Sequence, residues 1–219
     1  MAMGREKRQL IAWRAARELR SGMVVNLGIG IPTLVADYVP EGVHVIFHAE
    51  NGILGYGPSP QPGEEDPFLC NAGGLPVTVM EGASYFDSAL AFGIIRRGLL
   101  DMTILGALQV SEKGDLANWI VPGKRVPGVG GAVDLAQKAR RVVVVTEHLA
   151  RDGSPKILRA CTYPLTASKA VDLIITNMAV IEVTGAGLIL REVAREYTVE
   201  DVVRATGAPL AVPERVGRF

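Results

Sequence analysis

The chain has 219 residues, which allows one large domain with a sizeable core, and 48% of them are apolar and 21% charged, as in globular proteins. The 23 basic and 23 acidic residues cancel, so the positive surface typical of nucleic-acid-binding proteins is not expected. Two cysteines cannot form a disulfide framework, three histidines offer no structural zinc spacing and no membrane segment is evident, so we expect a cytoplasmic protein without nucleic-acid or membrane partners.

The first predicted element is an amphipathic helix near the N-terminus. Ile11, Ala15 and Leu19 recur at helical spacing, arginines occupy the other face, and Gly22 stands where a helix C-cap is expected. An arginine-rich start also occurs in transit peptides, but two glutamates interrupt this one and no cleavage pattern follows. We therefore assign the helix to the folded domain.

Two strands are predicted next. Residues 23–27 are a short apolar run that leads into a glycine turn at 28–33 and a short helix over 34–38. Residues 43–47 repeat the strand pattern and run directly into residues 48–52. Catalytic groups collect at such strand ends, so this junction is a candidate site.

Glycine and proline dominate residues 55–67, which we predict to be a loop that covers a site rather than a domain linker. Beyond this loop the apolar patterns predict a helix at 87–98 and strands at 77–80, 102–105 and 142–145.

The C-terminal part is predicted to hold a hairpin and a last helix. Residues 180–183 and 188–190 flank a turn, and Thr198-x-x-Asp201 predicts a capping box that begins a helix running to Gly207. The alternation of strands and helices indicates one α/β domain over residues 1–219, with a mostly parallel sheet, helices on both faces and an antiparallel edge pair.

Several common catalytic motifs are absent from the sequence. Residues 82–86 lack the final glycine of a nucleophile elbow, and residues 123–125 lack the spaced glycine and the Ser/Thr of a phosphate-binding P-loop. No H-E-x-x-H pair is present, and we expect no metal ion.

One alternative is a dinucleotide site. Gly28-x-Gly30 follows a strand, and Glu50 stands 22 residues after Gly28, where a ribose-binding acid would lie. Position 33 is threonine rather than the third glycine, and Pro32 stands at the helix entrance. An NAD-dependent oxidoreductase is therefore a weaker alternative, which NADH fluorescence would test.

The sharper pattern is Glu50, an acid at a strand end followed by Gly52, Gly55 and Gly57. Glycines there let a bulky ligand approach the backbone. Such a carboxylate can act as a general base, a metal ligand or a nucleophile toward an activated acyl group. The alternative is that Glu50 only caps a turn by accepting backbone hydrogen bonds.

These residues resemble the second, or β, subunit of the family I coenzyme A transferases of the succinyl-CoA:3-ketoacid type. The resemblance covers nearly the whole chain and rests on several blocks together. They are Leu27-Gly28-Ile29-Gly30-Ile31-Pro32, Glu50-Asn51-Gly52-Ile53-Leu54-Gly55, Asn71-Ala72-Gly73, Gly82-Ala83-Ser84-Tyr85-Phe86, Gly114-Asp115-Leu116-Ala117-Asn118-Trp119, Pro122-Gly123-Lys124 and Gly128-Val129-Gly130-Gly131-Ala132-Val133-Asp134-Leu135.

The resemblance implies a three-layer α/β fold related to ribose-phosphate isomerase and a ping-pong mechanism on Glu50. The carboxylate would form a mixed anhydride with the acyl group and then a thioester with coenzyme A, which would be a covalent intermediate and not a tightly bound cofactor. The serine that precedes this glutamate in the family is Ala49 here, which removes one local hydroxyl.

The resemblance also suggests roles for the neighbouring residues. Gly131 is the preferred backbone N–H donor to the oxyanion, with a turn-forming glycine as the alternative. Asn51 could orient Glu50 or a substrate carbonyl, or simply form an Asn-Gly turn. Backbone at Gly28, Gly30 and Gly130 would approach coenzyme A. The loop cations Lys124 and Arg125 could meet substrate anions but are more often just solvated.

The family is split between two chains, and this sequence matches only the second. The resemblance therefore implies pairing with a homologous first, or α, subunit in an α2β2 heterotetramer with the active site at the interface. The expected substrates are an acyl-CoA and a short carboxylic acid, with succinyl-CoA and acetoacetate first and 3-oxoadipate as the alternative. A non-catalytic member of the fold that binds coenzyme A or a sugar phosphate is a further alternative.

Overall fold

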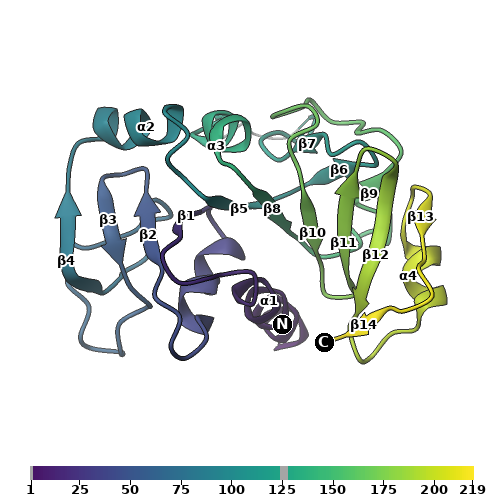
Figure 1. Ribbon diagram of the computed structural model, residues 1–219, viewed down its shortest axis with the longest axis horizontal. Coiled ribbons are helices and arrows are strands. Elements are labelled where there is room, and N and C mark those ends of the chain that lie inside the picture. The colour runs from purple at the N-terminus through teal and green to yellow at the C-terminus, as the bar shows by residue number, and fades with distance from the viewer. Residues whose placement is uncertain (1, 124–127) are drawn as a thin grey trace.

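A computed structural model describes residues 2–123 and 128–219 of the chain. Among these residues the strands form one eleven-stranded sheet and one three-stranded sheet (Figure 1). The main sheet has the order β13-β12-β11-β10-β8-β5-β1-β2-β3-β4, and β14 also pairs with β12. Its strands are β1 Val24–Leu27, β2 Ile46–Ala49, β3 Ile53–Tyr56, β4 Val79–Tyr85, β5 Met102–Gly106, β8 Val142–Val145, β10 Leu173–Ile175, β11 Ala179–Thr184, β12 Gly187–Val193, β13 Leu210–Ala211 and β14 Gly217–Arg218.

The centre of the main sheet is parallel, antiparallel pairs flank it on both sides, and the short β13 and β14 pair in parallel with β12 at one edge. Strands β10, β8, β5, β1 and β2 pair in parallel, while β10-β11-β12 and β2-β3-β4 pair antiparallel. All four valines of β8 are buried, as expected for a strand covered on both faces. The mostly parallel α/β fold and its antiparallel edge hairpin are confirmed.

Two helical layers cover opposite faces of this sheet. α1 (Ala2–Ala16) and the 3₁₀ helix η1 (Pro32–Tyr38) pack on one face, and α2 (Ser88–Arg96) and α3 (Ala132–Lys138) on the other (Figure 1). Alternate residues of β8 show this directly, because Val143 and Val145 join the core with α1 while Val142 and Val144 join the core with α2 and α3. The three layers are therefore those of a doubly wound fold.

Strand β1 is the point where the chain reverses its direction of winding. β2 pairs with one side of β1 and β5 with the other, so the next strands build the sheet outward in opposite directions. Ligands of such sheets bind in the crevice outside the carboxyl ends of the strands at this switch point. The position of the site is thus set by topology.

The predicted loop at residues 55–67 begins too early. Residues 53–56 form strand β3, and Gly55 lies in it with φ +89° where its register against β4 shifts. The predicted strand at 77–80 correspondingly becomes β4, which extends to Tyr85. Glycine in this strand marks a bulge rather than a loop, which is why composition alone was misleading.

The remaining elements follow the prediction in kind but shift at their ends. α1 ends at Ala16 although Leu19 is still buried, because the apolar spacing continues through a turn before Gly22. The side chain of Asp87 caps α2, and the predicted capping box of Thr198 and Asp201 opens α4 (Val199–Ala205).

The sequence did not indicate the small sheet, which comprises β6 Gln109–Ser111, β7 Leu116–Ala117 and β9 Ile157–Leu158. In the part of the chain that the structure describes, no helix has both the length and the hydropathy to cross a bilayer.

Candidate functional site

Glu50 lies on a tight turn at the carboxyl end of β2. Residues 50–52 connect β2 to β3, with Ala49 paired to Ile53 and the Gly52 N–H donating to the Ala49 carbonyl at 3.0 Å. Gly52 has φ +118°, and a Cβ atom there would stand 1.9 Å from the Phe86 carbonyl oxygen. This turn therefore requires glycine, and it holds the half-buried Glu50 carboxylate at the switch point.

Asn26 holds that carboxylate from the neighbouring strand. Its Nδ2 donates to Glu50 Oε2 at 2.9 Å and to the His48 carbonyl at 3.1 Å. Its Oδ1 accepts from Thr103 Oγ1 at 3.4 Å. Asn26 pairs with His48 across β1–β2 and with Thr103 across β1–β5, so the sheet register itself builds this chain of contacts.

His48 lies buried next to Asn26, behind the Glu50 carboxylate's hydrogen-bond partner. It is fully buried, its Nδ1 lies 3.3 Å from Asn26 Nδ2, and its ring stacks on Phe86 with centroids 6.3 Å apart. Burial lowers the pKa of His48, although the nearby Glu50 charge acts in the opposite direction. The imidazole is therefore neutral at pH 7.

Glu50 opens into a cavity of about 470 Å³ between the end of β1, the β5–β6 connection and the start of α3. The lining residues are Gly28, Ile29, Glu50, Leu105, Gly106, Ala107, Leu108, Asn118, Trp119, Gly128, Val129, Gly130, Gly131, Ala132 and Leu135. This lining combines one carboxylate and the Asn118 amide with apolar side chains and glycine backbone. It can therefore hold an acyl group in reach of a nucleophile.

The structure brings Gly131 next to Glu50, far apart as they are in sequence. A Cβ atom on Gly131 would lie 3.8 Å from Glu50 Cγ and 3.0 Å from Phe92 Cζ. Its φ of −78° is open to any residue, so the glycine is explained by close approach and not by backbone conformation. Gly130, with φ +59°, lines the same cavity.

Gly28 and Gly30 line two different cavities. Gly28 lines the cavity, but its N–H already donates to the Ile104 carbonyl at 2.9 Å, so this amide extends the sheet and does not point to a ligand. Gly30 lines a different cavity, where a Cβ atom would stand 3.8 Å from Arg8 Nη2.

Asn51 does not hydrogen-bond to Glu50 among the described residues. It is exposed, and its Nδ2 donates to the Cys70 carbonyl at 2.8 Å. The contact that orients Glu50 comes from Asn26, to which the sequence pattern assigned no role. A polar residue inside the apolar run of β1 was the available signal.

The predicted covering loop lies elsewhere. Among the described residues, none from 55 to 67 lines the Glu50 cavity, and Ser59 instead hydrogen-bonds to Asp37 of η1. The segment that approaches the site follows this loop, through the Asn51–Cys70 contact and Gly73, whose Cβ position lies 3.6 Å from Ile29. Lys124 and Arg125 fall outside the described residues.

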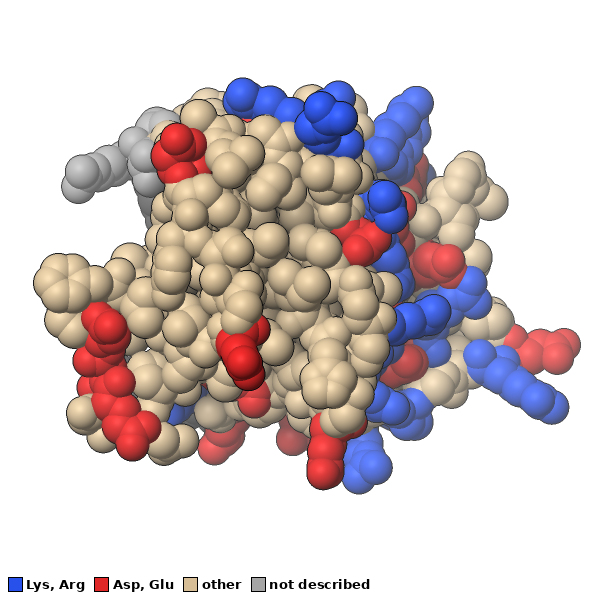
Figure 2. Space-filling view, turned by 60° about the vertical axis from the view of Figure 1, so that its left-hand side comes forward, with Lys and Arg blue, Asp and Glu red and all other residues tan. Residues whose placement is uncertain are grey.

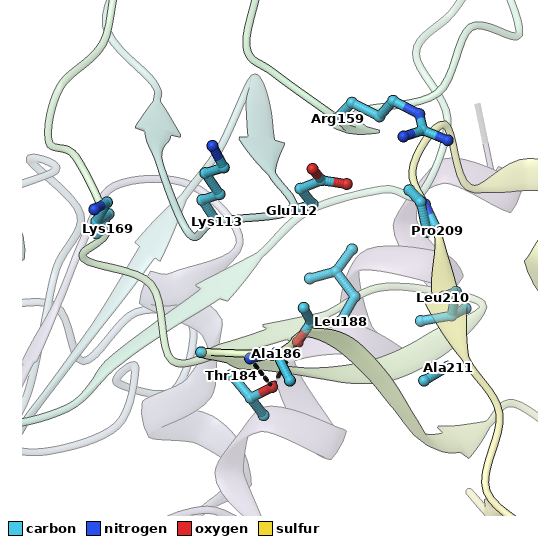
Figure 3. A pocket seen from close by; sticks show the side chains of 12 residues that line it. Glu112, Lys113, Arg159, Lys169, Thr184, Ala186, Leu188, Pro209, Leu210 and Ala211 are labelled. Carbon is cyan, nitrogen blue, oxygen red and sulfur yellow. Dashed lines mark hydrogen bonds between the residues drawn. The ribbon is translucent and has the colours of Figure 1, made fainter.

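A separate cavity of about 810 Å³ lies between the β11–β12 hairpin and β13 (Figure 3). Lys113, Arg159 and Lys169 surround it together with Glu112. None of the predicted site residues in the described part of the chain lines this cavity, so it is not the site that the sequence indicated.

The fold and the site define a doubly wound α/β protein with a glutamate at the switch point. A family model described as coenzyme A transferase matches residues 8–205. The β subunit of a probable coenzyme A transferase of Bacillus subtilis (strain 168) is 55% identical over 212 residues, covering 97% of this chain and 98% of that protein. The chain therefore belongs to the coenzyme A transferase family, and it corresponds to the second of the family's two subunits.

Other relatives differ in the substrates that their names give. The β subunit of the acetate CoA-transferase of Escherichia coli (strain K12) is 52% identical over 189 residues, 86% of each chain. The corresponding subunit of a probable succinyl-CoA:3-ketoacid coenzyme A transferase of Bacillus subtilis (strain 168) is 48% identical over 212 residues, 97% of this chain and 98% of that protein. The crystal structure of an acyl-CoA transferase from Escherichia coli O157:H7 shares the fold, with a TM-score of 0.77 and 22% identity, over 97% of this chain and 43% of that chain.

Proposed function

We propose that this protein transfers coenzyme A from succinyl-CoA to acetoacetate through a thioester on Glu50. The observation that carries the proposal is the placement of the carboxylate. Asn26 holds Oε2, while Oε1 accepts no hydrogen bond from a described residue, and the group faces a largely apolar cavity. One oxygen is thus fixed and the other is available to attack an acyl carbonyl.

The proposed reaction conserves the thioester. Oε1 of Glu50 attacks the acyl carbonyl of the donor, and the thiolate of coenzyme A leaves, which gives a mixed anhydride. The thiolate then attacks Cδ of Glu50, and the donor acid leaves as its carboxylate. The acceptor carboxylate repeats both steps in reverse and departs as the new acyl-CoA.

Each addition produces an oxyanion that requires a donor already in place. Gly131 directly precedes α3, where backbone N–H groups lack partners within the helix, and its Cα region lies beside Glu50. This proximity supports the predicted role of its N–H as an oxyanion donor. The apolar lining also supports the proposal, because the anhydride and the thioester both hydrolyse in water.

The decisive experiment uses the complex of this chain with its partner subunit. The complex is mixed with succinyl-CoA or acetoacetyl-CoA, and the intact mass of this chain is measured before the adduct is mapped. We expect a mass increase equal to coenzyme A on the peptide that holds Glu50, removed by hydroxylamine or by acetoacetate. Glu50→Gln abolishes it, whereas Glu41→Gln, at an exposed turn before β2, leaves it intact. Failure of the correctly assembled complex to form an adduct with any acyl-CoA would refute the nucleophile assignment.

We also propose that a homologous α subunit completes the enzyme as an α2β2 heterotetramer. The surface that runs from the Glu50 turn along β4 supports this, because large apolar side chains lie exposed on it and the face over β4 carries few charges (Figure 2). These side chains are Ile29, Phe68, Leu75, Val79, Met80, Tyr85 and Leu90, with exposed fractions from 38% to 90%. Patches of this kind mark protein interfaces.

Light scattering on the chain alone and on the co-expressed pair tests the assembly. We expect Tyr85→Lys, on the apolar face, to separate the two subunits while the chain itself stays folded. Val203→Lys, at another exposed apolar position, on α4, is the control and should leave the complex intact. A complex that survives the change at Tyr85 would place the partner on another face.

A further inference from the structure

A second cavity lies beside the Glu50 cavity at the same end of the sheet. It has a volume of about 1030 Å³ and is formed by α1, η1, the end of β8 and the segment 149–156. Ile29, Gly106 and Ala107 line both cavities. Since α1 and α3 cover opposite faces of the sheet, the two cavities meet across the carboxyl ends of β1 and β5, which is the switch point.

The second cavity is positively charged in a chain whose net charge is zero. Its four cations are Arg5, Arg8, Arg151 and Lys156, and we call it the cationic cavity. Within the described residues, none of the four forms an ion pair with a carboxylate. Two acids line it, and one of them, Asp37, already accepts hydrogen bonds from Ser59. The other acid is Glu147. The cations therefore outnumber the acids and have no carboxylate partners in place.

Lys156 is the most enclosed of these cations. Its half-buried ammonium donates to Thr146 Oγ1 at 3.0 Å, and that hydroxyl donates to the Ala107 carbonyl at 3.0 Å. Burial lowers the pKa of Lys156, with the charge of Glu147 acting in the opposite direction. An anion in the cavity would offset the cost of holding this charge away from water.

The spacing of residues along α1 directs two further cations to the same cavity. Arg5 and Arg8 are three residues apart on α1 and thus share one face of the helix. The guanidinium of Arg8 lies beside Gly30, with Nη2 3.8 Å from the position of a Cβ atom there. Charges from α1 and from the segment after β8 therefore converge, although they lie about 150 residues apart in sequence.

We propose that the cationic cavity binds phosphate groups. Guanidinium and ammonium groups bind phosphate through charge-assisted hydrogen bonds, and the volume suits a nucleotide. Two sources have this chemistry. The first is coenzyme A, whose nucleotide end would lie here while its thiol end reaches Glu50 past the residues that line both cavities. This source rests on the proposed function. The second is a separate nucleotide or free phosphate.

Kinetics of the assembled complex test the first source. The substrates are succinyl-CoA and succinyl-pantetheine, which has the same thioester but no nucleotide. We expect Arg8→Gln and Lys156→Gln each to lower kcat/KM for succinyl-CoA by about tenfold, the equivalent of one charge-assisted hydrogen bond, and to leave succinyl-pantetheine unchanged. Arg17→Gln, an exposed position just after the same helix, is the matched control and should change neither.

Calorimetric titration of the complex with pyrophosphate and with ADP tests the shared chemistry without catalysis. If Arg8→Gln and Lys156→Gln weaken the binding, the result supports the site. Competition with succinyl-CoA identifies coenzyme A as the source. Binding without competition identifies a separate ligand. Equal binding and equal kinetics in both variants and in the Arg17→Gln control would overturn the proposal. A missing adduct on Glu50 would refute the proposed function alone, since the titration still reports on the cavity.

Discussion

Replacement of Asn26 by alanine tests whether this side chain positions Glu50. The change removes the 2.9 Å hydrogen bond to Oε2 and the 3.1 Å hydrogen bond to the His48 carbonyl. A hydrogen bond to a charged group contributes about 1.5–3 kcal/mol, so the loss of positioning should slow adduct formation on Glu50 by about 10- to 150-fold. The buried carbonyl left without its donor should in addition destabilise the fold by about 1–3 kcal/mol.

The assay is the single-turnover rate of adduct formation on Glu50, measured by rapid quench and intact mass at saturating acyl-CoA. Asn177→Ala is the matched control, because Asn177 is also a buried asparagine with side-chain hydrogen bonds, to His148 N and Tyr197 OH, but lies outside the Glu50 cavity. It should lose stability and keep the rate. Equal rates in wild type and Asn26→Ala, with both variants folded, would refute the positioning role.

Three further predictions concern stability. Gly52→Ala should lower the free energy of unfolding by about 3 kcal/mol, because the strain of a left-handed backbone adds to the overlap of Cβ with a carbonyl oxygen. Gly63→Ala, at φ +91° but in open space, should lower it by only about 1 kcal/mol. Equal urea midpoints for the two variants would contradict this. Burial lowers the pKa of His148 to about 4, so between pH 6.5 and 4 only the unfolded chain takes up this proton. The free energy of unfolding should therefore fall by up to about 3 kcal/mol as the pH falls through this range. His148→Gln should flatten that pH dependence. Arg14→Met removes the cation that pairs with both Glu18 and Glu192, and it should lower the free energy of unfolding by about 3 kcal/mol. Arg17→Met should change it by almost nothing. Similar denaturation curves for the two variants would exclude a stabilising role for the ion pairs of Arg14.

The parts of the fold that sequence predicted well have local signals. The run of valines at 142–145, the hairpin at 180–190 and the Thr198–Asp201 capping box each depend on neighbouring residues, and each is present. The β3–β4 edge was missed because Gly55 belongs to a bulge, which depends on the partner strand. The small sheet likewise pairs segments distant in sequence and left no periodic pattern to find.

The same difference between local signals and long-range contacts holds for the site. Glu50 was identified from its place after a strand and from the family resemblance, and its proximity to Gly131 agrees with the role given to that glycine. Asn26 could not be assigned, because its contact with Glu50 exists only through the register of β1 against β2. The pairing of the Gly28 N–H with the Ile104 carbonyl likewise depends on how β1 aligns with β5, which the glycine pattern does not reveal.

The contact between Asn26 and Oε2 has a consequence for the second half of the proposed reaction. When the thiolate attacks Cδ of Glu50 in the anhydride, Oε1 bridges to the acyl group and leaves with the donor acid, so the developing oxyanion is Oε2. Nδ2 of Asn26 already lies 2.9 Å from this oxygen. The group that positions the carboxylate in the resting enzyme would therefore stabilise the charge at the step that forms the thioester. Gly131 would then serve attack on the substrate carbonyl and Asn26 attack on the glutamyl carbonyl, which accounts for two separate donors beside one carboxylate.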